Sequence, residues 1–284
     1  MEVIAKDVLA PRIARLVIQA PRIAAKAQPG HFVMVRLQDR AERIPLTIAD
    51  FDRNRGSITL IIQEVGKSSA MIAALEAGDR FADVLGPLGT PYPIEKLGTV
   101  VGVAGGLGAA PLYPKVKALY EAGNQVITIL GAQRQEMLIL TEELQAVSHE
   151  LIITTDDGSF GEHGLVTGPL RRVLETKRVA EVIAIGPVPM MDACCQVTRE
   201  LNVKTVVSLN AVMVDGTGMC GGCRVTVGGE SKFCCVDGPA FDGLQVDFAE
   251  LRQRQRYYHN QEKNVYLAFQ EEHEGMEGCR CRAK

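Results

Sequence analysis

The chain of 284 residues has no tryptophan, and aromatic residues make up only 5% of it. Its formal net charge of −3 gives no reason to expect binding to nucleic acid or to an anionic membrane surface. No apolar run reaches the length of a membrane-spanning helix, and the first residues lack the basic-then-apolar order of a signal peptide. We therefore expect a cytoplasmic protein that does not associate with membranes.

Histidine is scarce, with five residues, whereas there are eight cysteines. Two adjacent pairs among them do not suit a secreted disulfide framework in a chain this long, so metal-type cysteine use in a reducing compartment is expected. The pair Cys194-Cys195 lies in an expected helix and is interpreted as packing without a role. Cys279 and Cys281 end a polar tail that is expected to fray, with a contact to another chain as the alternative.

The most informative stretch is VDGTGMCGGCRVTVGGESKFCC, residues 214–235. Its candidate ligands are separated by four, two and eleven residues, and they are Asp215, Cys220, Cys223 and Cys235. This is the spacing of a plant-type ferredoxin with an aspartate in the first ligand position. Glycines between the ligands let the backbone wrap closely around an inorganic group. The stretch therefore predicts a 2Fe–2S cluster.

Two alternatives concern the same cysteines. A structural zinc site could use Cys220 and Cys223 with the pair Cys234/Cys235. Within the expected hairpin, a three-residue loop at 228–230 sets Cys223 opposite Cys235 and gathers apolar side chains on one face. A two-residue loop would set Cys223 opposite Cys234 and place a lysine opposite a valine. We therefore expect the three-residue loop, with Cys235 as the fourth ligand.

Residues 1–96 predict a small antiparallel β-barrel, because short β-rich runs alternate with turn residues. The expected strands are 13–19, 31–37, 57–63 and 81–85. Two polar segments are candidate phosphate contacts: RIPLTIA at 43–49, and GKSSA at 66–70, which opens an expected helix Ala70–Glu76. Each has an ordinary alternative, a solvated arginine or a simple helix cap.

Residues 97–210 predict a doubly wound parallel sheet, because apolar strands alternate with helices. The expected strands are 99–104, 125–130, 151–155, 181–185 and 204–209. One helix is expected after the loop at 105–111 and ends at residue 122, and three more are expected at 140–147, 166–174 and 190–201. Three glycine-containing loops follow strands, at 105–111, 156–164 and 186–191. Ligands of such sheets bind beyond the carboxyl ends of the strands, so these loops predict a nucleotide site. Residues 211–284 form the third part, the cluster lobe and the tail.

A barrel, a nucleotide sheet and a ferredoxin-type loop in this order resemble the flavin-containing electron-transfer subunits of the ferredoxin reductase superfamily. Over about residues 3–250 the chain is most similar to the small (alpha) subunits of NADH-dependent reduced ferredoxin:NADP oxidoreductases, also known as sulfide dehydrogenase subunits. VDGTGMCGGCRV followed by FCCVDGP, with Asp215 as first ligand, is the most specific element. The related subunits of dihydroorotate dehydrogenase use four cysteines, so Asp215 counts against that relationship.

The resemblance implies binding sites for FAD and for a nicotinamide nucleotide. RIPLTI and VGKSS resemble the two flavin motifs, which implies as flavin residues Arg43, Pro45, Leu46, Thr47, Gly66, Lys67, Ser68 and Ser69. The three glycine loops match nucleotide loops, which implies as nucleotide residues Gly105, Gly106, Gly108, Ala109, Asp156, Asp157, Gly158, Gly186, Pro187 and Met190. The family implies NAD(H), while Gln133, where arginine is commoner, and Arg134 leave NADP(H) open.

The resemblance also implies an activity and a partner. Hydride passes between NAD(H) and FAD, and single electrons pass through the cluster, so no catalytic side chain is expected. The implied partner is a larger subunit with a second FAD and 4Fe–4S clusters, forming a heterodimer that performs electron bifurcation and reaches ferredoxin. The alternatives are an NADH-oxidising subunit of a dihydroorotate or sulfide dehydrogenase, and a nucleotide-binding scaffold with a structural zinc lobe.

Overall fold

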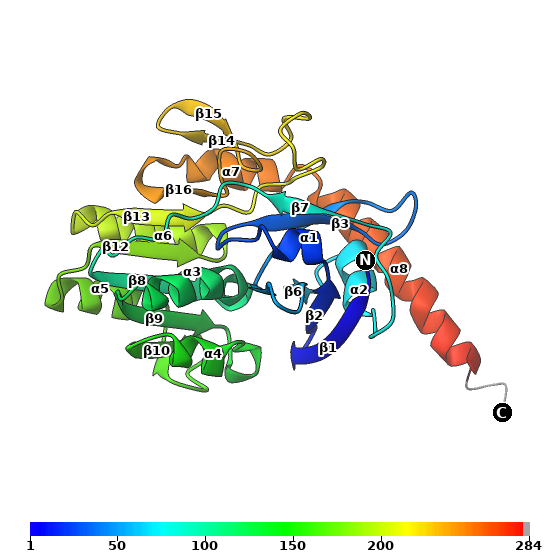
Figure 1. The fold of residues 1–284 in the computed structure, drawn as a ribbon, viewed down its shortest axis with the longest axis horizontal. Coiled ribbons are helices and arrows are strands. Elements are labelled where there is room, and N and C mark those ends of the chain that lie inside the picture. Colours follow the sequence, from blue (N-terminus) through cyan, green and yellow to red (C-terminus); the bar gives the residue numbers. More distant parts are fainter. Residues whose placement is uncertain (281–284) are drawn as a thin grey trace.

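The computed structural model describes residues 1–280, with side chains up to Glu272; Cys281 and the side chain of Cys279 lie outside the described residues. The amino-terminal part forms two antiparallel sheets, β1-β2-β6-β5 and β4-β3-β7 (Figure 1). Their strands are β1 Val3–Ala10, β2 Ile13–Gln19, β3 Phe32–Arg36, β4 Ile44–Thr47, β5 Asp50–Asp52, β6 Ser57–Gln63 and β7 Asp83–Leu88.

These two sheets pack face to face as the expected barrel. Buried side chains such as Leu16 and Ile18 on β2 alternate with more exposed ones along the strands, and the buried side chains of both sheets form one core. Two short helices, α1 (Pro21–Ala24) and α2 (Lys67–Ala73), pack against β6. The prediction of a helix beginning at Ala70 was wrong, because the helix begins at Lys67. The Ser69 hydroxyl accepts a hydrogen bond from the Gly66 amide at 3.0 Å, which stabilises this earlier first turn.

Strand β3 is buried on both of its faces. Val33 and Val35 point into the barrel core, whereas Phe32 and Met34 belong to the core that the cluster lobe shares with the nucleotide domain. The uninterrupted apolar run of this strand follows from that position, since a strand covered on both sides does not alternate with polar residues. The barrel therefore meets the cluster lobe directly through β3.

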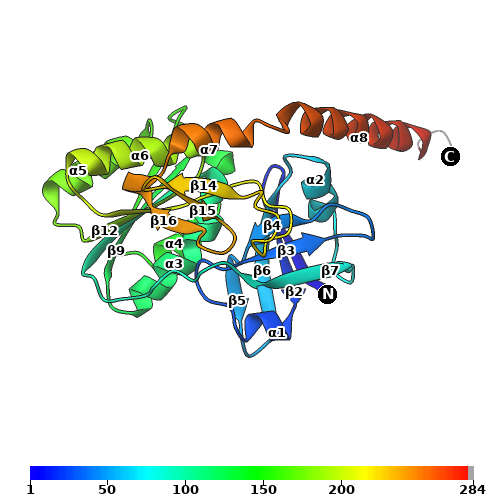
Figure 2. The same ribbon diagram turned by 90° about the horizontal axis from the view of Figure 1, so that it is seen from above.

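The second part forms the expected parallel sheet, in the order β11-β10-β9-β8-β12-β13-β16. Its strands are β8 Thr99–Gly105, β9 Gln125–Ala132, β10 Glu150–Thr155, β11 Glu162–His163, β12 Glu181–Ile185, β13 Thr205–Ser208 and β16 Ala240–Asp242, and only β16 runs antiparallel to its neighbour. The helices on one face are α3 Ala109–Glu121 and α4 Thr141–Ala146, and those on the other are α5 Thr167–Thr176 and α6 Val188–Glu200 (Figure 2). Cys194 and Cys195 are fully buried on α6, as expected of packing residues.

The third part is joined to the sheet of the second. Strand β16 pairs with β13, with Val207 opposite Phe241, so the cluster lobe supplies an edge strand of the nucleotide sheet. The lobe also contains the hairpin β14 Arg224–Val227 and β15 Glu230–Phe233, followed by α7 Phe248–Gln255. The final helix, α8 His259–Arg280, runs from the lobe past the barrel (Figures 1 and 2). None of the described helices is long and apolar enough to cross a membrane.

A fully buried lysine lies where the barrel meets the nucleotide domain. Lys115 on α3 places its Nζ 5.7 Å from the centroid of the Tyr92 ring, and its side chain passes beside Gly30 of the barrel. Within the described part of the chain, no atom accepts a hydrogen bond from this Nζ. Burial lowers the pKa of Lys115 to about 7, because the charged ammonium loses its hydration there.

We expect Lys115→Met to stabilise the fold near neutral pH. The folded-state pKa lies below the ordinary value of 10.5, so the unfolded chain binds more protons between about pH 7 and pH 10.5 and stability rises with pH across that window. Methionine fills a similar volume without a charge, so the free energy of unfolding at pH 7 should rise by about 1–4 kcal/mol. Urea unfolding of both proteins at pH 7 and pH 9 measures this.

The same substitution at an exposed lysine, Lys26→Met, is the control. It should change neither the stability at pH 7 nor its increase with pH. Equal pH dependence in wild type and Lys115→Met would show that Lys115 is not a titrating buried group.

Candidate functional site

The loop that follows β13 brings the predicted cluster ligands together in two pairs. The Sγ atoms of Cys223 and Cys235 lie 3.2 Å apart, and both residues are buried. Asp215 accepts the amide hydrogen of Cys220 at 2.7 Å through Oδ2. The amide of Thr217 donates to Oδ1 of Asp215, and this bond contributes most to lowering the pKa of Asp215. The aspartate is therefore held as a carboxylate next to Cys220.

The predicted register of the hairpin was wrong. Thr226 pairs with Ser231, and Val225 pairs with Lys232, so the loop has two residues and not three. Both loop glycines have positive φ, +60° at Gly228 and +79° at Gly229, as the favoured two-residue hairpin turn requires. This turn chemistry prevails over the cost of placing Lys232 opposite Val225, because the Lys232 ammonium reaches Glu230 at 2.6 Å.

Cys235 nevertheless faces Cys223, because β15 ends before it. The amides of Val236 and Asp237 both donate to the carbonyl of Phe233, so the chain turns and the alternation of a strand no longer applies at residue 235. The Sγ of Cys234 instead donates to the carbonyl of Leu209 at 3.6 Å. Burial raises the pKa of both thiols to about 12, so geometry distinguishes the two cysteines and thiol acidity does not.

This donor set suits a two-iron cluster better than a single zinc ion. A structural zinc site gathers four ligands around one point, but no three His, Cys, Asp or Glu side chains of the described residues do so. A 2Fe–2S cluster has two irons, each with its own pair of protein ligands. Asp215 with Cys220, and Cys223 with Cys235, supply two such pairs.

The two predicted flavin segments lie next to each other on the barrel. Arg43 precedes β4, which carries Pro45, Leu46 and Thr47 as half-buried residues, and Arg43 reaches Asp83 at 3.1 Å. The second segment, 66–69, caps and begins α2. The Ser68 hydroxyl donates to Glu42 at 2.8 Å, which ties the first turn of α2 to the residue before Arg43.

Strand β3 connects the first flavin segment to the cluster loop. Met34 is the register partner of Pro45. The Met34 side chain packs against the cluster loop: a Cβ built on Gly216 would lie 2.5 Å from the Met34 Cγ, so the loop approaches this strand more closely than any residue but glycine allows. Gly216 also has φ +76° and directly follows Asp215. One methionine thus separates the flavin segment from the first cluster ligand.

The three predicted nucleotide loops occupy one edge of the parallel sheet. Two of them touch: a Cβ at Gly108 would lie 2.1 Å from the carbonyl oxygen of Ile185, and the Gly105 amide lies 3.1 Å from where a Cβ of Gly186 would be. Pro187 follows Gly186, and Met190 lies in the first turn of α6 against Gly105. These glycines keep side chains out of the turn where a phosphate would approach.

The third loop lies beside the end of β9. The amides of Asp156 and Asp157 donate to the carbonyls of Ala132 and Gln133. The Ser159 hydroxyl accepts from the Gln135 amide at 2.8 Å, which fixes the segment that carries Arg134. Hydrogen bonds from Ser159 lower the pKa of Asp157 most, and the positive charge of Arg134 lowers it further, so an exposed carboxylate lies near an exposed guanidinium here.

The nucleotide loops also meet the barrel near the first flavin segment. Ala109, Ala110 and Leu112 of α3 share a core with Ala49 and Ile61 of the barrel. Ala49 directly follows the predicted flavin segment. Bound nicotinamide and flavin would therefore approach each other across this junction.

Sequence reasoning missed four residues that join these sites: Arg12, Met34, Glu42 and Tyr266. The apolar run FVMVR could have indicated that Met34 is buried on the outer face of the barrel. The other three contact residues far from them in the sequence, so no local pattern could have identified them.

Comparison with known proteins supports these assignments region by region. Residues 210–247 match the iron–sulfur cluster binding domain of dihydroorotate dehydrogenase B, and residues 103–196 match the oxidoreductase NAD-binding domain. A Thermotoga maritima protein named as a homologue of the dihydroorotate dehydrogenase B (NAD(+)) electron transfer subunit is 44% identical over 268 residues, which cover 94% of this chain and 95% of the relative. The chain belongs to the family of dihydroorotate dehydrogenase B electron-transfer subunits and their homologues.

Two further comparisons show the breadth of the family. The electron transfer subunit of Bacillus caldolyticus dihydroorotate dehydrogenase B is 34% identical over 257 residues, covering 87% of this chain and 97% of the relative. A solved structure of an NADH-dependent reduced ferredoxin-NADP oxidoreductase superposes with a TM-score of 0.90 at 44% identity, covering 94% of this chain and 97% of the other. The expected ferredoxin-reductase-like fold is confirmed by this likeness.

The cofactors expected from the sequence, FAD, NAD(H) and a 2Fe–2S cluster, are those of the family. The iron–sulfur match counts against the alternative of a zinc lobe. The individual residues named for each cofactor stay predictions, as do the boundaries of the three parts.

We expect Cys235, and not Cys234, to be required for cluster assembly. Cys235→Ala removes a sulfur that lies 3.2 Å from Cys223, whereas Cys234→Ala removes one that points to Leu209. Iron and acid-labile sulfide per chain should fall by roughly an order of magnitude in the first variant and stay at the wild-type level in the second. A cluster retained in Cys235→Ala and lost in Cys234→Ala would reverse the assignment.

The carboxylate ligand can be tested by converting it to a thiolate. Asp215→Cys should still assemble a 2Fe–2S cluster, because the spacing becomes that of plant-type ferredoxins. The reduction potential should shift, because ligand type and its hydrogen bonds set it, although the two ligands carry the same charge. Glu175→Gln, at an exposed carboxylate of α5 on the nucleotide domain, is the control and should leave the potential unchanged. An unchanged potential and electron paramagnetic resonance spectrum in Asp215→Cys would mean that Asp215 does not bind iron.

Proposed function

We propose that this chain is the flavin and iron–sulfur electron-transfer subunit of an NADH-dependent oxidoreductase, which exchanges hydride with NAD(H) and passes single electrons to a larger subunit. The observation that carries the proposal is the position of Met34, which is the register partner of Pro45 and packs with its side chain against Gly216. The flavin segment is thus the neighbour of β3 in the sheet and the cluster loop packs on β3, which supports a short path for electrons between them.

The residues of the barrel would bind and orient the flavin. Arg43 is half exposed, and among the described residues its guanidinium pairs with the partly exposed Asp83, a contact that it could exchange for a flavin phosphate or the ring. In α2 the first hydrogen bond within the helix runs from Ala70 to Gly66, which leaves the amides of residues 67–69 outside the helical ladder. Lys67 adds a positive charge beside them.

The nucleotide loops would place the nicotinamide against this flavin. When bound, FAD and the cluster supply the conversion between a two-electron donor and single electrons. The chain itself contributes orientation: packed alanines of α3 hold the first glycine loop against the barrel. No side chain is needed to move a proton in this exchange, in line with the absence of a predicted catalytic residue.

The proposal of a larger assembly is supported by the likeness to the ferredoxin-NADP oxidoreductase, whose structure is described in terms of flavin-based electron bifurcation. We propose a heterodimer with a larger FAD- and 4Fe–4S-containing subunit that reaches ferredoxin. The identity of 44% to that structure, against 34% to the Bacillus caldolyticus dihydroorotate dehydrogenase B subunit, supports this assembly, while the Thermotoga maritima relative, named as a homologue of such subunits, is also 44% identical. Asp215 in place of the first cysteine favours it as well.

The second candidate is the electron-transfer subunit of a dihydroorotate dehydrogenase, favoured by the name of the matching iron–sulfur domain. Co-purification from the native cell separates the two. A partner that carries 4Fe–4S clusters and reduces NADP supports the first, and one that oxidises dihydroorotate supports the second.

The isolated chain should contain FAD and oxidise NADH with an artificial one-electron acceptor such as ferricyanide. Arg43→Ala should lower FAD content and activity together by roughly three- to tenfold, because a charge-assisted contact to the flavin is lost. Arg171→Ala, which breaks an exposed ion pair to Glu200 on the nucleotide domain, is the control and should keep both. Full FAD occupancy in Arg43→Ala would count against the flavin assignment.

A further inference from the structure

One face of the carboxy-terminal helix α8 lies along the barrel. Tyr266, Phe269 and Gln270 of α8 are half-buried, whereas Val265 and Leu267 between and beside them are exposed. The rings of Tyr266 and Phe269 stack with centroids 6.5 Å apart. Helix α8 also packs against α2, whose first turn belongs to the second flavin segment. A segment some 200 residues later in the chain thus returns to the flavin barrel.

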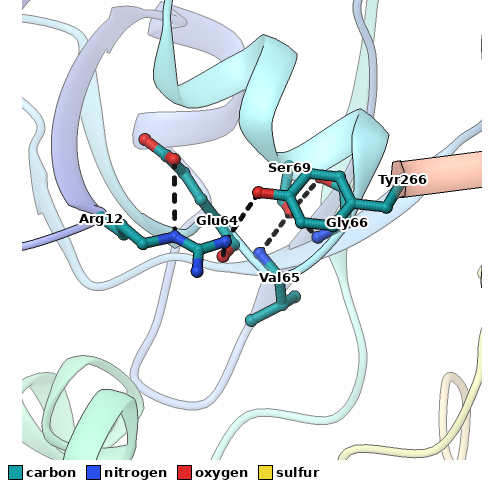
Figure 3. Close-up of polar contacts among 6 residues, drawn as sticks. All are labelled: Arg12, Glu64, Val65, Gly66, Ser69 and Tyr266. Atoms are coloured by element: carbon teal, nitrogen blue, oxygen red, sulfur yellow. Dashed lines mark hydrogen bonds and ion pairs between the residues drawn. The ribbon is translucent and has the colours of Figure 1, made fainter. Parts of the chain in front are cut away.

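Tyr266 makes the most specific contact of this helix (Figure 3). Its hydroxyl accepts a hydrogen bond from Nη2 of Arg12 at 2.6 Å. The Arg12 guanidinium also lies over the Tyr266 ring, with Cζ 5.8 Å from the centroid. Arg12 lies in the turn between β1 and β2 with φ +63°, so its own backbone position is fixed by a tight turn.

Arg12 in turn holds the beginning of the flavin loop, which we define as residues 64–69. Nη2 of Arg12 donates to the Glu64 carbonyl at 2.7 Å, and the Glu64 amide donates to the Arg12 carbonyl at 2.9 Å. The side chains add an ion pair of 3.8 Å. Both backbone groups of Glu64 are therefore bound by one residue.

Ser69 holds the other end of the same loop. Its hydroxyl accepts from the amides of Val65 and Gly66, both at 3.0 Å, and donates to the Gly66 carbonyl (Figure 3). The flavin loop is therefore held at both ends, at Glu64 by Arg12 and at residues 65 and 66 by Ser69.

We propose that Tyr266 is a positioning residue for FAD: through Arg12, it fixes the flavin loop in the conformation that binds the cofactor. The proposal rests on the proposed flavin site at residues 66–69. Tyr266 orients the Arg12 guanidinium, and that guanidinium holds Glu64 in place. Retention of the cofactor then depends on a helix that does not belong to the flavin domain.

The test compares the rate of FAD release from full-length holoprotein variants, followed by the rise in flavin fluorescence on dilution. Tyr266→Phe keeps the ring and removes only the hydroxyl. Release should be roughly two- to tenfold faster, the range expected for the loss of one hydrogen bond. The unfolding temperature in saturating FAD should not change by more than a degree or two. Tyr257→Phe, the same change at an exposed tyrosine before α8, should leave release unchanged.

A double-mutant cycle shows whether Tyr266 acts through Arg12. Arg12→Gln alone should speed release at least as much as Tyr266→Phe. Adding Tyr266→Phe to Arg12→Gln should have little further effect, because the contact is already lost. Additive effects of the two substitutions would mean that Tyr266 acts by another route, and the proposal would fall.

Ser69→Ala separates a failure of this proposal from a failure of the flavin site. If Ser69→Ala speeds FAD release and Tyr266→Phe does not, the flavin site stands and the role of Tyr266 is refuted. If neither substitution changes release, FAD is not held by the flavin loop and both proposals fail. Faster release in Tyr257→Phe as well as in Tyr266→Phe would indicate a general effect on the end of the chain and would also refute the positioning role.

Discussion

The structure depends on the burial of β3 on both faces. Val33 and Val35 complete the barrel core, while Phe32 and Met34 are covered by the cluster lobe. A strand that loses water from both sides contributes about twice the apolar burial of a half-exposed strand. The predicted flavin segment pairs with this strand and the cluster loop packs on it, so under the proposed function β3 would also set the distance between the two redox sites. Met34 would then serve both packing and electron transfer.

Much of the fold could be predicted from local patterns. Strands β2, β6 and β12 have the predicted bounds, because each combines β-branched or other apolar residues with clear turn residues at both ends. Strands β1, β4 and β5 were not predicted. Most of their residues are half-buried or exposed, so these segments lack the hydrophobic pattern of a strand. They are strands because they pair with neighbouring strands. The edge strand β16 was missed for the same reason, since its three residues acquire their role from β13.

Candidate site residues could be named from the sequence where chemistry requires particular residue types at fixed spacing, as in the cluster loop and the glycine loops, and their roles stay predictions. The hairpin shows the limit of such reasoning. Side-chain polarity favoured a three-residue loop, but two consecutive glycines with positive φ form a tighter turn. The expected partner of Cys223 is correct in spite of this, because a turn after Phe233 and not the strand register brings Cys235 to it. The contact of Tyr266 with Arg12 joins residues 254 positions apart, which no single-sequence pattern encodes.

The cluster lobe is joined to both of the other domains. Through β16 it shares backbone hydrogen bonds with the nucleotide sheet, and on its other side Thr90, which follows β7, binds it twice: the Thr90 amide donates to the Gly238 carbonyl at 2.6 Å and its hydroxyl donates to the Val236 carbonyl at 2.8 Å. A swing of the nucleotide domain away from the barrel would have to break one of these two attachments. The lobe therefore braces the nucleotide domain against the barrel, and a change in the spacing of these two parts would cost the hydrogen bonds of one attachment.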